Sequence, residues 1–424
     1  IIGKSFRLPK DIDSFDSLYE TLISKTDCID YHPKDRFNIK NYYDKDNSIG
    51  KMRTEKAGYT NNIYDFDADF FNISPKEAKT MDPQQRIMLE LIYECIEDSR
   101  INIKNIKGTK TGVFMGSCSM EYFNAESEDA EFCNEYSITG GLLTLLSNRI
   151  SYFYDLKGPS LTLDTACSSS GHALHLACQS IINGESEMSF VGGSNILISP
   201  ETFVGFSQAT MLSPDGKCKT FDDNANGYVR GEGFVSLLLK PLEKAIEDND
   251  KIYAVINKTG INQDGKTDSI TMPNPKAQMD LLEDLYQDED LNNLIYIEAH
   301  GTGTLVGDYN ETLSIGTVLG KNKKDKLNIG SIKTNLGHTE ASSGLVSILK
   351  ICLMMEKNQL LPNINFEIPN QKIDFNNLNL NVVTDVIPFK KDKVIMGVNN
   401  FGFGGANFHC VLENYNKKSN KTIS

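Results

Sequence analysis

The chain has 424 residues, of which 39% are hydrophobic and 24% are charged. This composition is typical of globular proteins, and the length allows two or three average domains or one large two-lobed fold. The formal net charge of −14 argues against nonspecific binding to nucleic acid or to anionic membranes. No apolar run reaches the ~18 residues that a membrane-spanning helix needs.

The nine cysteines include no CxxC pair, and their odd number excludes complete internal disulfide pairing. The six histidines are too scattered for a zinc signature. We therefore expect free thiols, no bound metal and a cytoplasmic location. The first residues show no signal-peptide pattern, and because the chain begins at Ile1 instead of methionine, we expect a segment of a longer protein.

Strand and helix patterns alternate along the chain. Apolar runs typical of strands lie at residues 111–117, 159–165, 188–198, 251–261, 293–299, 328–332 and 394–400. Helical patterns lie at residues 75–99, 170–183 and 277–287. This alternation predicts an α/β fold with sheets buried on both faces. A similar organisation on either side of residues 237–251 suggests a duplicated fold, and residues 414–424 are predicted to be poorly ordered.

The stretch GINQDGKT, residues 260–267, matches the spacing of a phosphate-binding loop, and Glu298 ends a later apolar run as a magnesium-binding acid would. Such a loop must open a helix whose amides face the phosphates. Here Pro273 and Pro275 follow, together with β-branched residues, and these disfavour an immediate helix. We therefore interpret the match as accidental and expect a structural loop.

Cys167 lies where a strand pattern gives way to a helix pattern, within the stretch DTACSSSGHAL. A thiol at the amino terminus of a helix experiences the positive end of the helix dipole, which favours the nucleophilic thiolate. Cys95, Cys178, Cys352 and Cys410 lie in apolar patterns and are expected to be inert core residues. Cys167 is therefore the candidate nucleophile.

Two histidines follow strand patterns in glycine-rich contexts, His300 in YIEAHGTGT and His338 in SIKTNLGHTEASSG. Catalytic groups collect at the carboxyl ends of strands in α/β folds. His172 and His175, on the helix after the nucleophile, are expected to pack or cap, and His32 has no informative context. We expect His300 and His338 to act with the candidate nucleophile.

Closely spaced glycines mark the stretch GVNNFGFGGANFHC, residues 397–410. Such a turn can present backbone N–H groups to a ligand. A dinucleotide-binding loop is the alternative, but the glycine spacing differs and no acid follows at ~20 residues. The stretch predicts an oxyanion-binding turn.

Taken together, DTACSSS, EAHGTGT, SIKTNLGHTEAS and FGFGGAN have the order and spacing of the ketosynthase domains of type I polyketide synthases. The chain resembles these domains, which are relatives of fatty-acid β-ketoacyl synthases, over essentially its whole length. Further matching stretches are IIGKSFRLP at the start, MDPQQRIMLE (81–90) and LSPDGKCKTFDDNANGYVRGEG (212–233).

The resemblance implies a thiolase-like fold in which two duplicated halves form a five-layered αβαβα sandwich, usually as a homodimer. The halves would span residues 1–245, with the nucleophile, and 246–424, with both histidines and the glycine-rich turn. The implied activity is that of an acyltransferase of the 3-oxoacyl-[acyl-carrier-protein] synthase type. Cys167 would hold an acyl chain as a thioester, and a malonyl unit would lose CO₂ and attack it.

The resemblance also implies a role for individual residues of the site. His300 and His338 would stabilise the enolate oxygen and orient the malonyl group. Lys333 would order the histidine network. The backbone N–H groups of Cys167 and Phe401 would form the oxyanion hole.

The implied substrates are carried on the phosphopantetheine of acyl carrier proteins, and Thr302 and Thr304 would hydrogen-bond that arm. No cofactor bound by the domain itself is implied. The implied partners are carrier domains and other polyketide synthase domains, including an acyltransferase in cis or in trans. Because carrier domains are commonly acidic, the lysine-rich run at residues 321–326 is a weak candidate for docking them.

Several positions depart from the family pattern. Gly171 and His172 replace a bulky apolar pair, which would reshape the acyl pocket. Tyr309 and Asn310 replace the Pro-Ile of GDPIE, and Phe408 replaces an alanine. No catalytic group is lost. One alternative stays open, a ketosynthase-like domain that only transfers acyl chains, although such domains usually lack the histidine of HGTGT. A simple thiolase is disfavoured, because the second site of that family is a cysteine in a different glycine context.

Overall fold

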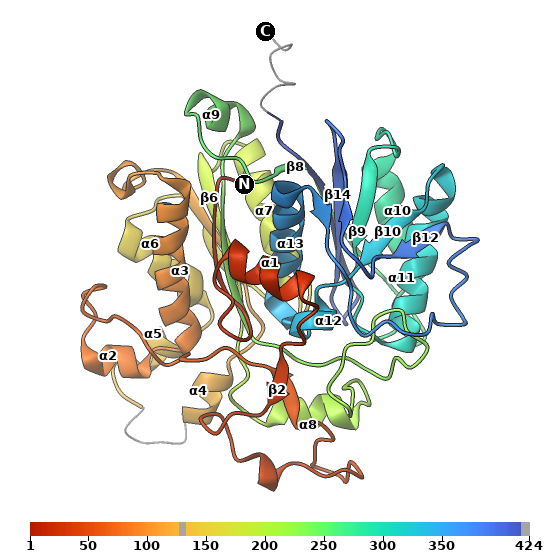
Figure 1. The fold of residues 1–424 in the computed structure, drawn as a ribbon. Helices are drawn as coiled ribbons and strands as arrows, with labels where there is room; N and C mark the ends of the chain where they lie inside the picture. The colour runs from red at the N-terminus through yellow and green to blue at the C-terminus, as the bar shows by residue number, and fades with distance from the viewer. Residues whose placement is uncertain (127–132, 417–424) are drawn as a thin grey trace.

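Two mixed sheets form the framework of the computed structural model, which describes residues 1–126 and 133–416 (Figure 1). The first sheet has the order β1-β7-β6-β4-β5. Its strands are β1 (Gly3–Arg7), β4 (Thr111–Gly116), β5 (Ser160–Leu163), β6 (Met188–Asn195) and β7 (Gly233–Leu239). The second has the order β12-β10-β9-β14-β15-β8. Its strands are β8 (Val255–Gln263), β9 (Leu294–Glu298), β10 (Leu327–Gly330), β12 (Leu380–Val382), β14 (Ile395–Phe401) and β15 (Ala406–Glu413).

The two sheets repeat one arrangement. In the first, β4 pairs in parallel with β5 and β6, while β7 pairs antiparallel with β6 and β1. In the second, β9 pairs in parallel with β10 and β14, while β15 pairs antiparallel with β14 and β8. The order β8-β15-β14-β9-β10 therefore reproduces β1-β7-β6-β4-β5, and the duplication suggested by the sequence is present in the topology.

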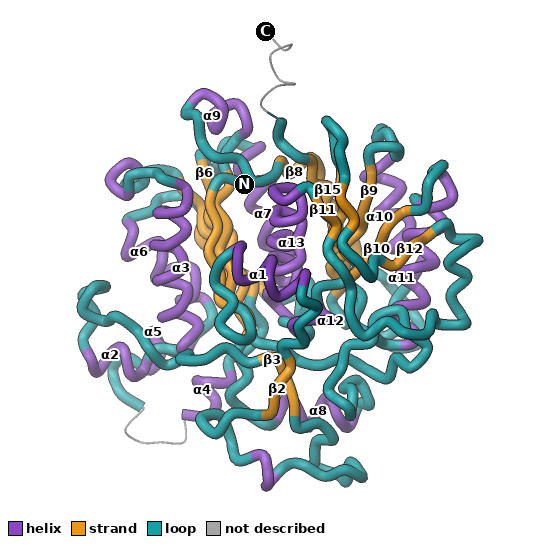
Figure 2. The backbone as a smooth tube through the Cα atoms, viewed as in Figure 1, coloured by secondary structure: helices purple, strands orange, loops and turns teal. Residues whose placement is uncertain are grey.

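Helices α7 (Ser169–Ile182) and α13 (Ser343–Lys357) lie between the sheets and contact both of them (Figure 2). The outer face of the first sheet is covered by α3 (Pro83–Ser99) and α6 (Thr144–Tyr154). On the other side, α10 (Pro275–Tyr286) and α11 (Leu305–Val318) cover the second sheet (Figure 1). The layers follow the order α-β-α-β-α, which confirms the predicted sandwich.

The apolar pattern of α13 explains its central place. Its buried residues run without interruption from Ser343 to Met355, so the helix is enclosed on all sides. It shares one hydrophobic cluster with α7 and with strands of both sheets. Two further clusters lie under the outer helices, one in each half. The central cluster joins the halves.

The remaining elements connect this framework. They are α1 (Phe15–Ile23), β2 (Ile29–Tyr31), η1 (Ile39–Asn41), β3 (Lys56–Gly58), α2 (Pro75–Thr80), η2 (Ile103–Asn105), α4 (Glu121–Glu126), α5 (Ser137–Gly141), α8 (Glu201–Gln208), α9 (Leu242–Glu247), η3 (Gly320–Asn322), α12 (Lys333–Leu336), η4 (Glu340–Ser342), β11 (Gln359–Leu360) and β13 (Ile387–Pro388).

The single helix predicted over residues 75–99 is wrong. The structure has two helices there, α2 and α3, because Asp82 has an extended conformation and caps α3 through a bond from the Gln84 N–H, while Pro83 is the first residue of α3. Proline fits the first turn of a helix but cannot continue one from the preceding turn. Each of the seven predicted strands overlaps a strand of the structure.

The phosphate-loop spacing at residues 260–267 lies partly inside a strand. β8 runs through Gln263, and α10 begins only at Pro275. The carboxylate of Glu298, the supposed magnesium ligand, pairs with the buried Lys350 ammonium at 2.8 Å. The rejection of a nucleotide-binding loop is therefore confirmed.

Other expectations concern the ends and surface of the chain. Residues 417–424, within the segment predicted to be poorly ordered, lie outside the described residues. Among the residues that the structure does describe, no helix is long and apolar enough to cross a membrane. The division at residues 245 and 246, which falls inside α9, stays a prediction.

Candidate active site

Cys167 sits on a sharp bend between β5 and α7. Ala166 adopts the left-handed backbone conformation at φ +56°, which turns the chain immediately before the nucleophile. The Ser169 hydroxyl accepts from the Thr165 N–H at 2.9 Å and donates to the Ala166 carbonyl at 2.6 Å. Ser168 is the N-cap residue of α7. The sequence prediction of a strand-to-helix elbow is confirmed, with Cys167 one residue outside the cap.

The carbonyl group of Cys167 is held by the other half of the molecule. It accepts from the Asn400 side-chain amide at 2.9 Å and from the Ser343 hydroxyl at 3.1 Å. Asn400 lies at the end of β14, and Ser343 begins α13. The nucleophile is therefore fixed relative to the residues that follow the second sheet.

Burial raises the pKa of the Cys167 thiol to about 12. The nearby Glu340 carboxylate raises it further, whereas Lys333 and two backbone N–H groups lower it. The expectation that the helix dipole alone yields a resting thiolate is therefore wrong. Loss of water around the sulfur outweighs the dipole, and the resting thiol is protonated at neutral pH.

His300 follows β9, and hydrogen bonds hold both its backbone and its ring. Its backbone N–H donates to Glu311 at 2.6 Å. Its ring Nδ1 accepts from the Phe401 N–H at 3.3 Å. Because Nδ1 is an acceptor, the proton of the neutral ring sits on Nε2. Burial and the Lys333 charge hold the His300 pKa well below its usual range, so the ring is neutral.

His338 follows α12, and a hydrogen bond to its ring Nδ1 fixes its tautomer in the same way. Its ring Nδ1 accepts from the Glu340 N–H at 3.2 Å, which again places the proton on Nε2. Burial, Lys333 and His300 hold its pKa well below the usual range. Within the described chain, the buried Nε2 of His338 finds no hydrogen-bond partner. An N–H donor left free in a buried site is available to a substrate oxygen.

The two imidazoles face each other edge to face, with ring centroids 5.2 Å apart. Phe401, which binds the His300 ring, directly follows Asn400, which binds the Cys167 carbonyl. These contacts bring Cys167, His300 and His338 into one site, as the sequence predicted. The site offers one thiol and two neutral N–H donors.

Lys333 is the first residue of α12 and is 1% exposed. Burial lowers its pKa, while Glu298 and Glu311 act in the opposite direction. Its Nζ makes no hydrogen bond to any described residue, so no direct bond to either histidine supports the predicted ordering role. Its positive charge instead disfavours protonation of both rings.

The glycine-rich turn bears on one predicted residue. The N–H of Phe401 is directed at the His300 ring. The backbone N–H groups of Phe403 and of Cys167 itself lower the pKa of the Cys167 thiol. Phe401 therefore anchors a histidine, its oxyanion role stays a prediction, and Phe403 is a second candidate for that role.

Thr302 and Thr304 lie in the loop between His300 and α11, with their hydroxyl oxygens 3.2 Å apart. The loop is shaped by Asp308, whose carboxylate accepts the N–H groups of Phe221 at 2.7 Å and Gly303 at 3.1 Å. Burial raises the pKa of Asp308 to about 7. Tyr309, which stands where the family has proline, lies within α11 without breaking it.

Sequence analysis missed an ion pair beside the site. The Arg230 guanidinium donates from Nε and Nη2 to the Glu340 carboxylate at 2.6 and 2.9 Å. Glu121 lies 3.5 Å from the same guanidinium. In the sequence, the only sign of a role for Glu340 was its place in the stretch GHTEAS. Cys118, which follows β4, also lies within electrostatic range of Cys167, and only its position after a strand could have indicated this.

Three further histidines make local contacts, as expected for two of them. His172 Nδ1 contacts the Ser168 carbonyl at 3.1 Å, and His175 Nδ1 contacts the Thr259 hydroxyl at 2.9 Å. His32 packs against Phe37 and contacts the Tyr59 hydroxyl at 2.6 Å. No disulfide joins the cysteines among the described residues; Cys95, Cys352 and Cys410 are buried, and Cys178 is partly buried.

Two departures from the family pattern prove to be one feature. A Cβ atom added at Gly171 would lie 2.5 Å from the Phe408 ring and 2.9 Å from the Asn400 side chain. The large ring on β15 therefore occupies the space that a side chain on α7 would need. This exchange repacks the centre of the molecule between α7 and β15.

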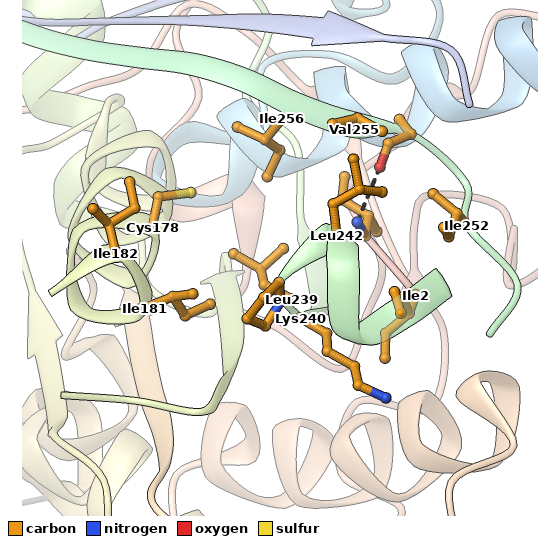
Figure 3. Close-up of a pocket in the computed structure, with 14 residues that line it drawn as sticks. Ile2, Cys178, Ile181, Ile182, Leu239, Lys240, Leu242, Ile252, Val255 and Ile256 are labelled. Carbon is orange, nitrogen blue, oxygen red and sulfur yellow. Dashed lines mark hydrogen bonds between the residues drawn. The ribbon is translucent and has the colours of Figure 1, made fainter. Parts of the chain in front are cut away.

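An apolar pocket on the surface is separate from this site (Figure 3). Its lining includes Ile181 and Ile182 at the carboxyl end of α7, Leu242 on α9, and Val255 and Ile256 on β8. Cys167 precedes the other end of α7, whose 14 residues span about 20 Å. The pocket is therefore not part of the immediate surroundings of that thiol.

Comparison with known proteins identifies the arrangement. The family model of the β-ketoacyl synthase N-terminal domain matches residues 1–245, and that of the C-terminal domain matches residues 253–367. A ketoacyl-synthetase C-terminal extension matches residues 369–424. The chain belongs to the β-ketoacyl synthase family. It is a ketosynthase domain, a transferase of the 3-oxoacyl synthase type, and the resemblance inferred from its motifs is confirmed.

Curated relatives of this ketosynthase domain are fungal enzymes. It is 43% identical to a partially reducing polyketide synthase of Menisporopsis theobromae, over 97% of the chain and 16% of that protein. It is 42% identical to the compactin diketide synthase of Penicillium citrinum, over 99% of the chain and 16% of that protein. The chain thus spans about a sixth of the length of these relatives.

Solved ketosynthases share the fold. The ketosynthase from module 6 of the bacillaene synthase of Bacillus subtilis 168 is 38% identical, with a TM-score of 0.91 over 98% of this chain and 72% of that one. An oxazolomycin ketosynthase domain of Streptomyces albus is 32% identical, with a TM-score of 0.94 over 98% and 75%. The ketosynthase domain therefore has the thiolase-like fold predicted from its sequence.

Proposed function

We propose that this ketosynthase domain catalyses decarboxylative Claisen condensation of a malonyl-type unit, carried by an acyl carrier protein, with an acyl chain bound to Cys167. The observation that carries the proposal is the pair of neutral imidazoles, His300 and His338, whose Nδ1 atoms are both occupied by backbone donors. Each ring is left with an Nε2–H donor. Two such donors suit a negative charge that develops on one oxygen.

In the loading step, the Cys167 thiol attacks the thioester of the incoming acyl chain. The bond from the acyl carbon to the carrier sulfur breaks, and the thiol proton ends on the departing pantetheine thiol, so no net base is needed. The N–H groups of Cys167 and Phe403 would stabilise the tetrahedral oxyanion. Their position at the sulfur supports this assignment.

In the second step, the malonyl carboxylate leaves as CO₂ and its electron pair forms an enolate. The Nε2–H groups of His300 and His338 would donate to the enolate oxygen. Decarboxylation consumes no base, and protonated rings are unnecessary for donation. The depressed pKa values of both rings and the unpartnered Nε2 of His338 support this role. Lys333 would keep both rings neutral through its charge.

In the final step, the carbanion attacks the acyl carbon on Cys167, and the tetrahedral intermediate expels the Cys167 thiolate. One proton from solvent restores the resting thiol. The thiol pKa of about 12 means that this protonation is favourable at neutral pH. The same two N–H groups would serve the oxyanion in both acyl-transfer steps.

The phosphopantetheine arm would enter beside Thr302 and Thr304, whose adjacent hydroxyls can bond its amides. Three apolar side chains on the first turns of α11 support an entrance here, since they are exposed next to Thr304: Leu305, Val306 and Tyr309. The lysine-rich residues 321–326 lie before β10, at the amino end of that strand, whereas Lys333 and His338 follow its carboxyl end. We therefore disfavour that run as the carrier docking site.

We also propose that the domain works as a homodimer through β5. This strand lies at the edge of the first sheet and pairs only with β4 among the described strands. All four of its residues are partly exposed, whereas β4 is buried throughout. Tyr152 on α6 and Ile138 on α5 are 87% and 59% exposed nearby in the chain. An open edge flanked by apolar residues suits a two-fold partner.

The wider setting follows from the relatives, which are reducing polyketide synthases. We propose that the chain acts within a longer polyketide synthase, in polyketide or fatty-acid-like biosynthesis, with carrier domains and an acyltransferase in cis or in trans. The lack of any disulfide among the described cysteines supports a reducing compartment such as the cytoplasm. We further propose functional halves at residues 1–245 and 246–424, since each sheet comes from one of them.

One experiment separates condensation from transfer alone. The domain is incubated with acyl-loaded and malonyl-loaded carrier protein, and the carrier is analysed by mass spectrometry. A β-ketoacyl product is expected. Acylated Cys167 without chain extension would refute condensation and favour the transfer-only domain, for which the comparisons offer no support.

Two single-residue variants test which residue acts in which step of the proposed reaction. Cys167→Ala should abolish acyl loading, because no other nucleophile replaces the thiol. His338→Ala should lower malonyl decarboxylation by about 10²–10³-fold, the usual effect of losing one oxyanion donor, while loading of Cys167 persists. Full decarboxylation by His338→Ala would contradict its assigned role.

A further inference from the structure

A buried chain of hydrogen bonds runs from α10 to the loop that carries His300. The Tyr286 hydroxyl, at the end of α10, contacts His409 Nε2 on β15 at 3.0 Å. His409 Nδ1 contacts Asn399 Oδ1 on the neighbouring strand β14 at 2.6 Å. The Asn399 amide donates to Glu311 on α11 at 2.8 Å. None of the four residues is more than 5% exposed.

Glu311 connects this chain of hydrogen bonds to the loop that carries His300. Its Oε1 accepts the His300 N–H at 2.6 Å, and its Oε2 accepts the Gly301 N–H at 2.8 Å. Gly301 has φ +46°, in the left-handed region that favours glycine. One carboxylate therefore sets the place where the chain turns at His300.

The donors and acceptors in this chain of hydrogen bonds can be assigned in only one way. The backbone N–H groups and the Asn399 amide all donate to Glu311, which therefore acts as an acceptor throughout. Asn399 Oδ1 can only accept, so His409 carries its proton on Nδ1. His409 Nε2 is then bare and accepts from the Tyr286 hydroxyl. The chain thus selects one tautomer of His409, the one with the Nδ1 proton.

Strand β14 carries two separate contacts toward the same histidine. Asn399 acts on the backbone of His300 through Glu311, and Phe401, two residues further along, binds the His300 ring. A shift of Asn399 against Glu311 would therefore move the His300 backbone relative to the donor that holds its ring.

We propose that His409 is a positioning residue for His300, acting through Asn399 and Glu311 to fix where the His300 Nε2–H points. The inference rests on the proposed role of His300 in decarboxylation. His409 touches no reacting atom. Its chain of hydrogen bonds leads to Glu311 and His300, the proposed enolate donor, and not to Cys167.

Two amide substitutions at His409 test this role. In His409→Asn, the amide nitrogen can stand near the place of Nδ1 and keep the bond to Asn399. In His409→Gln, the longer side chain brings its amide toward the place of Nε2, and the donor to Asn399 is lost. We expect His409→Gln to lower malonyl decarboxylation by about 10–10²-fold, the effect of a small misplacement of a catalytic group.

The same variants should differ little in acyl loading. We expect His409→Gln to load Cys167 at close to the wild-type rate and His409→Asn to recover most of the lost decarboxylation. His175→Gln is the matched control, because His175 also bonds a hydroxyl, that of Thr259, but has no bond that leads to His300. Decarboxylation and loading are measured separately with malonyl-loaded and acyl-loaded carrier protein.

The outcomes are distinct. Equal rates of decarboxylation in the Asn and Gln variants, or equal losses in loading and decarboxylation, would overturn the positioning role. Failure of the wild-type domain to decarboxylate would instead refute the proposed function. If His409→Gln does not fold, Asn399→Leu replaces it: the size of the side chain is kept, the donor to Glu311 is removed without adding a charge, and the same selective loss is expected.

Discussion

At the residue scale, the protonation of Cys167 leads to a first prediction. Only the thiolate reacts with iodoacetamide, and burial raises the pKa of this thiol to about 12. Far below the pKa, the thiolate fraction rises about tenfold per pH unit. We therefore expect the alkylation rate of Cys167 to rise steadily between pH 7 and pH 9, measured by mass spectrometry of its peptide. A plateau below pH 8 would show that a thiolate exists at rest.

Glu340 carries a second prediction because it acts on two catalytic residues. Its carboxylate raises the Cys167 pKa, while its backbone N–H fixes the His338 ring. Glu340→Gln should lower the thiol pKa and speed alkylation at pH 8, by about tenfold for a shift of one unit. It also leaves the buried Arg230 short of a charge, which should cost about 3–5 kcal/mol of unfolding free energy.

Glu121→Gln is the matched control for Glu340→Gln. It removes the other carboxylate near the Arg230 guanidinium, at 3.5 Å, without touching the His338 ring. Its alkylation rate should stay close to that of the wild type. An unchanged rate in Glu340→Gln would mean that burial alone sets the protonation of Cys167.

Sequence reasoning located the three chemical groups but not their state. Cys167, His300 and His338 could be predicted because each follows an apolar strand pattern in a stretch of small residues. The thiol pKa could not, because it depends on burial and on Glu340, far away in the chain. Phe401 and Phe403 lie in the same glycine-rich turn, and only the backbone direction separates a histidine anchor from an oxyanion donor.

At the element scale, the contact between α7 and β15 gives a third prediction. Gly171 leaves room for Phe408, so Gly171→Leu should overpack the centre and cost about 1–3 kcal/mol of unfolding free energy. Phe408→Ala should cost about 3–5 kcal/mol by opening a cavity. The double variant restores the bulky residue and the alanine of the family pattern. We expect it to be more stable than the sum of the single changes by over ~1 kcal/mol in urea unfolding.

A helix glycine elsewhere provides the control for that cycle. Gly205 on α8 has open space around the position of a Cβ atom. Gly205→Ala should therefore stabilise the protein slightly, because alanine is the better helix former by ~1 kcal/mol. Additive costs in the Gly171 and Phe408 double variant would contradict the idea that the two departures compensate each other.

Elements could be predicted where the sequence pattern is simple. The strands before the proposed catalytic residues are continuous apolar runs, so they were correctly predicted as strands, although the predicted first and last residues differ from the observed ones. The run at residues 75–99 hid a break because helical residues flank Asp82 and Pro83 on both sides, and the cap bond decides between one helix and two. Helix α13 is buried all round, so no amphipathic period marks it.

At the scale of the whole molecule, duplication explains how one thiol meets two histidines. β5 leads to Cys167 and the central helix α7, and its counterpart β10 leads to His338 and the central helix α13. Because the two central helices share one core, the chain ends that precede them meet. The second half adds His300 after β9 and the glycine-rich turn after β14. The proposed nucleophile and the proposed enolate donors thus come from equivalent ends of two repeats.

The same architecture leaves β5 open, and this gives the last prediction. The carbonyl groups of Pro159 and Leu163 accept N–H groups from β4 and from the residue just after its end. Alternation therefore turns the backbone of Ser160 and Thr162 toward the free edge. Thr162→Pro removes an outward N–H and leaves the β4 ladder intact. We expect the wild type to elute as a dimer of about twice 47.3 kDa in size-exclusion chromatography with light scattering, and the variant as a monomer.

Leu161→Ala is the control for the strand itself, since it trims a side chain of β5 and keeps every backbone donor. It should remain dimeric, with an unfolding temperature near that of the wild type. Circular dichroism of Thr162→Pro should retain the α/β spectrum, because each half keeps its own sheet and outer helices. If Thr162→Pro stays dimeric with native structure, the two copies do not meet through β5, and another surface must join them. A monomeric wild type would contradict the proposed homodimer, and the site described above would then be complete within one chain.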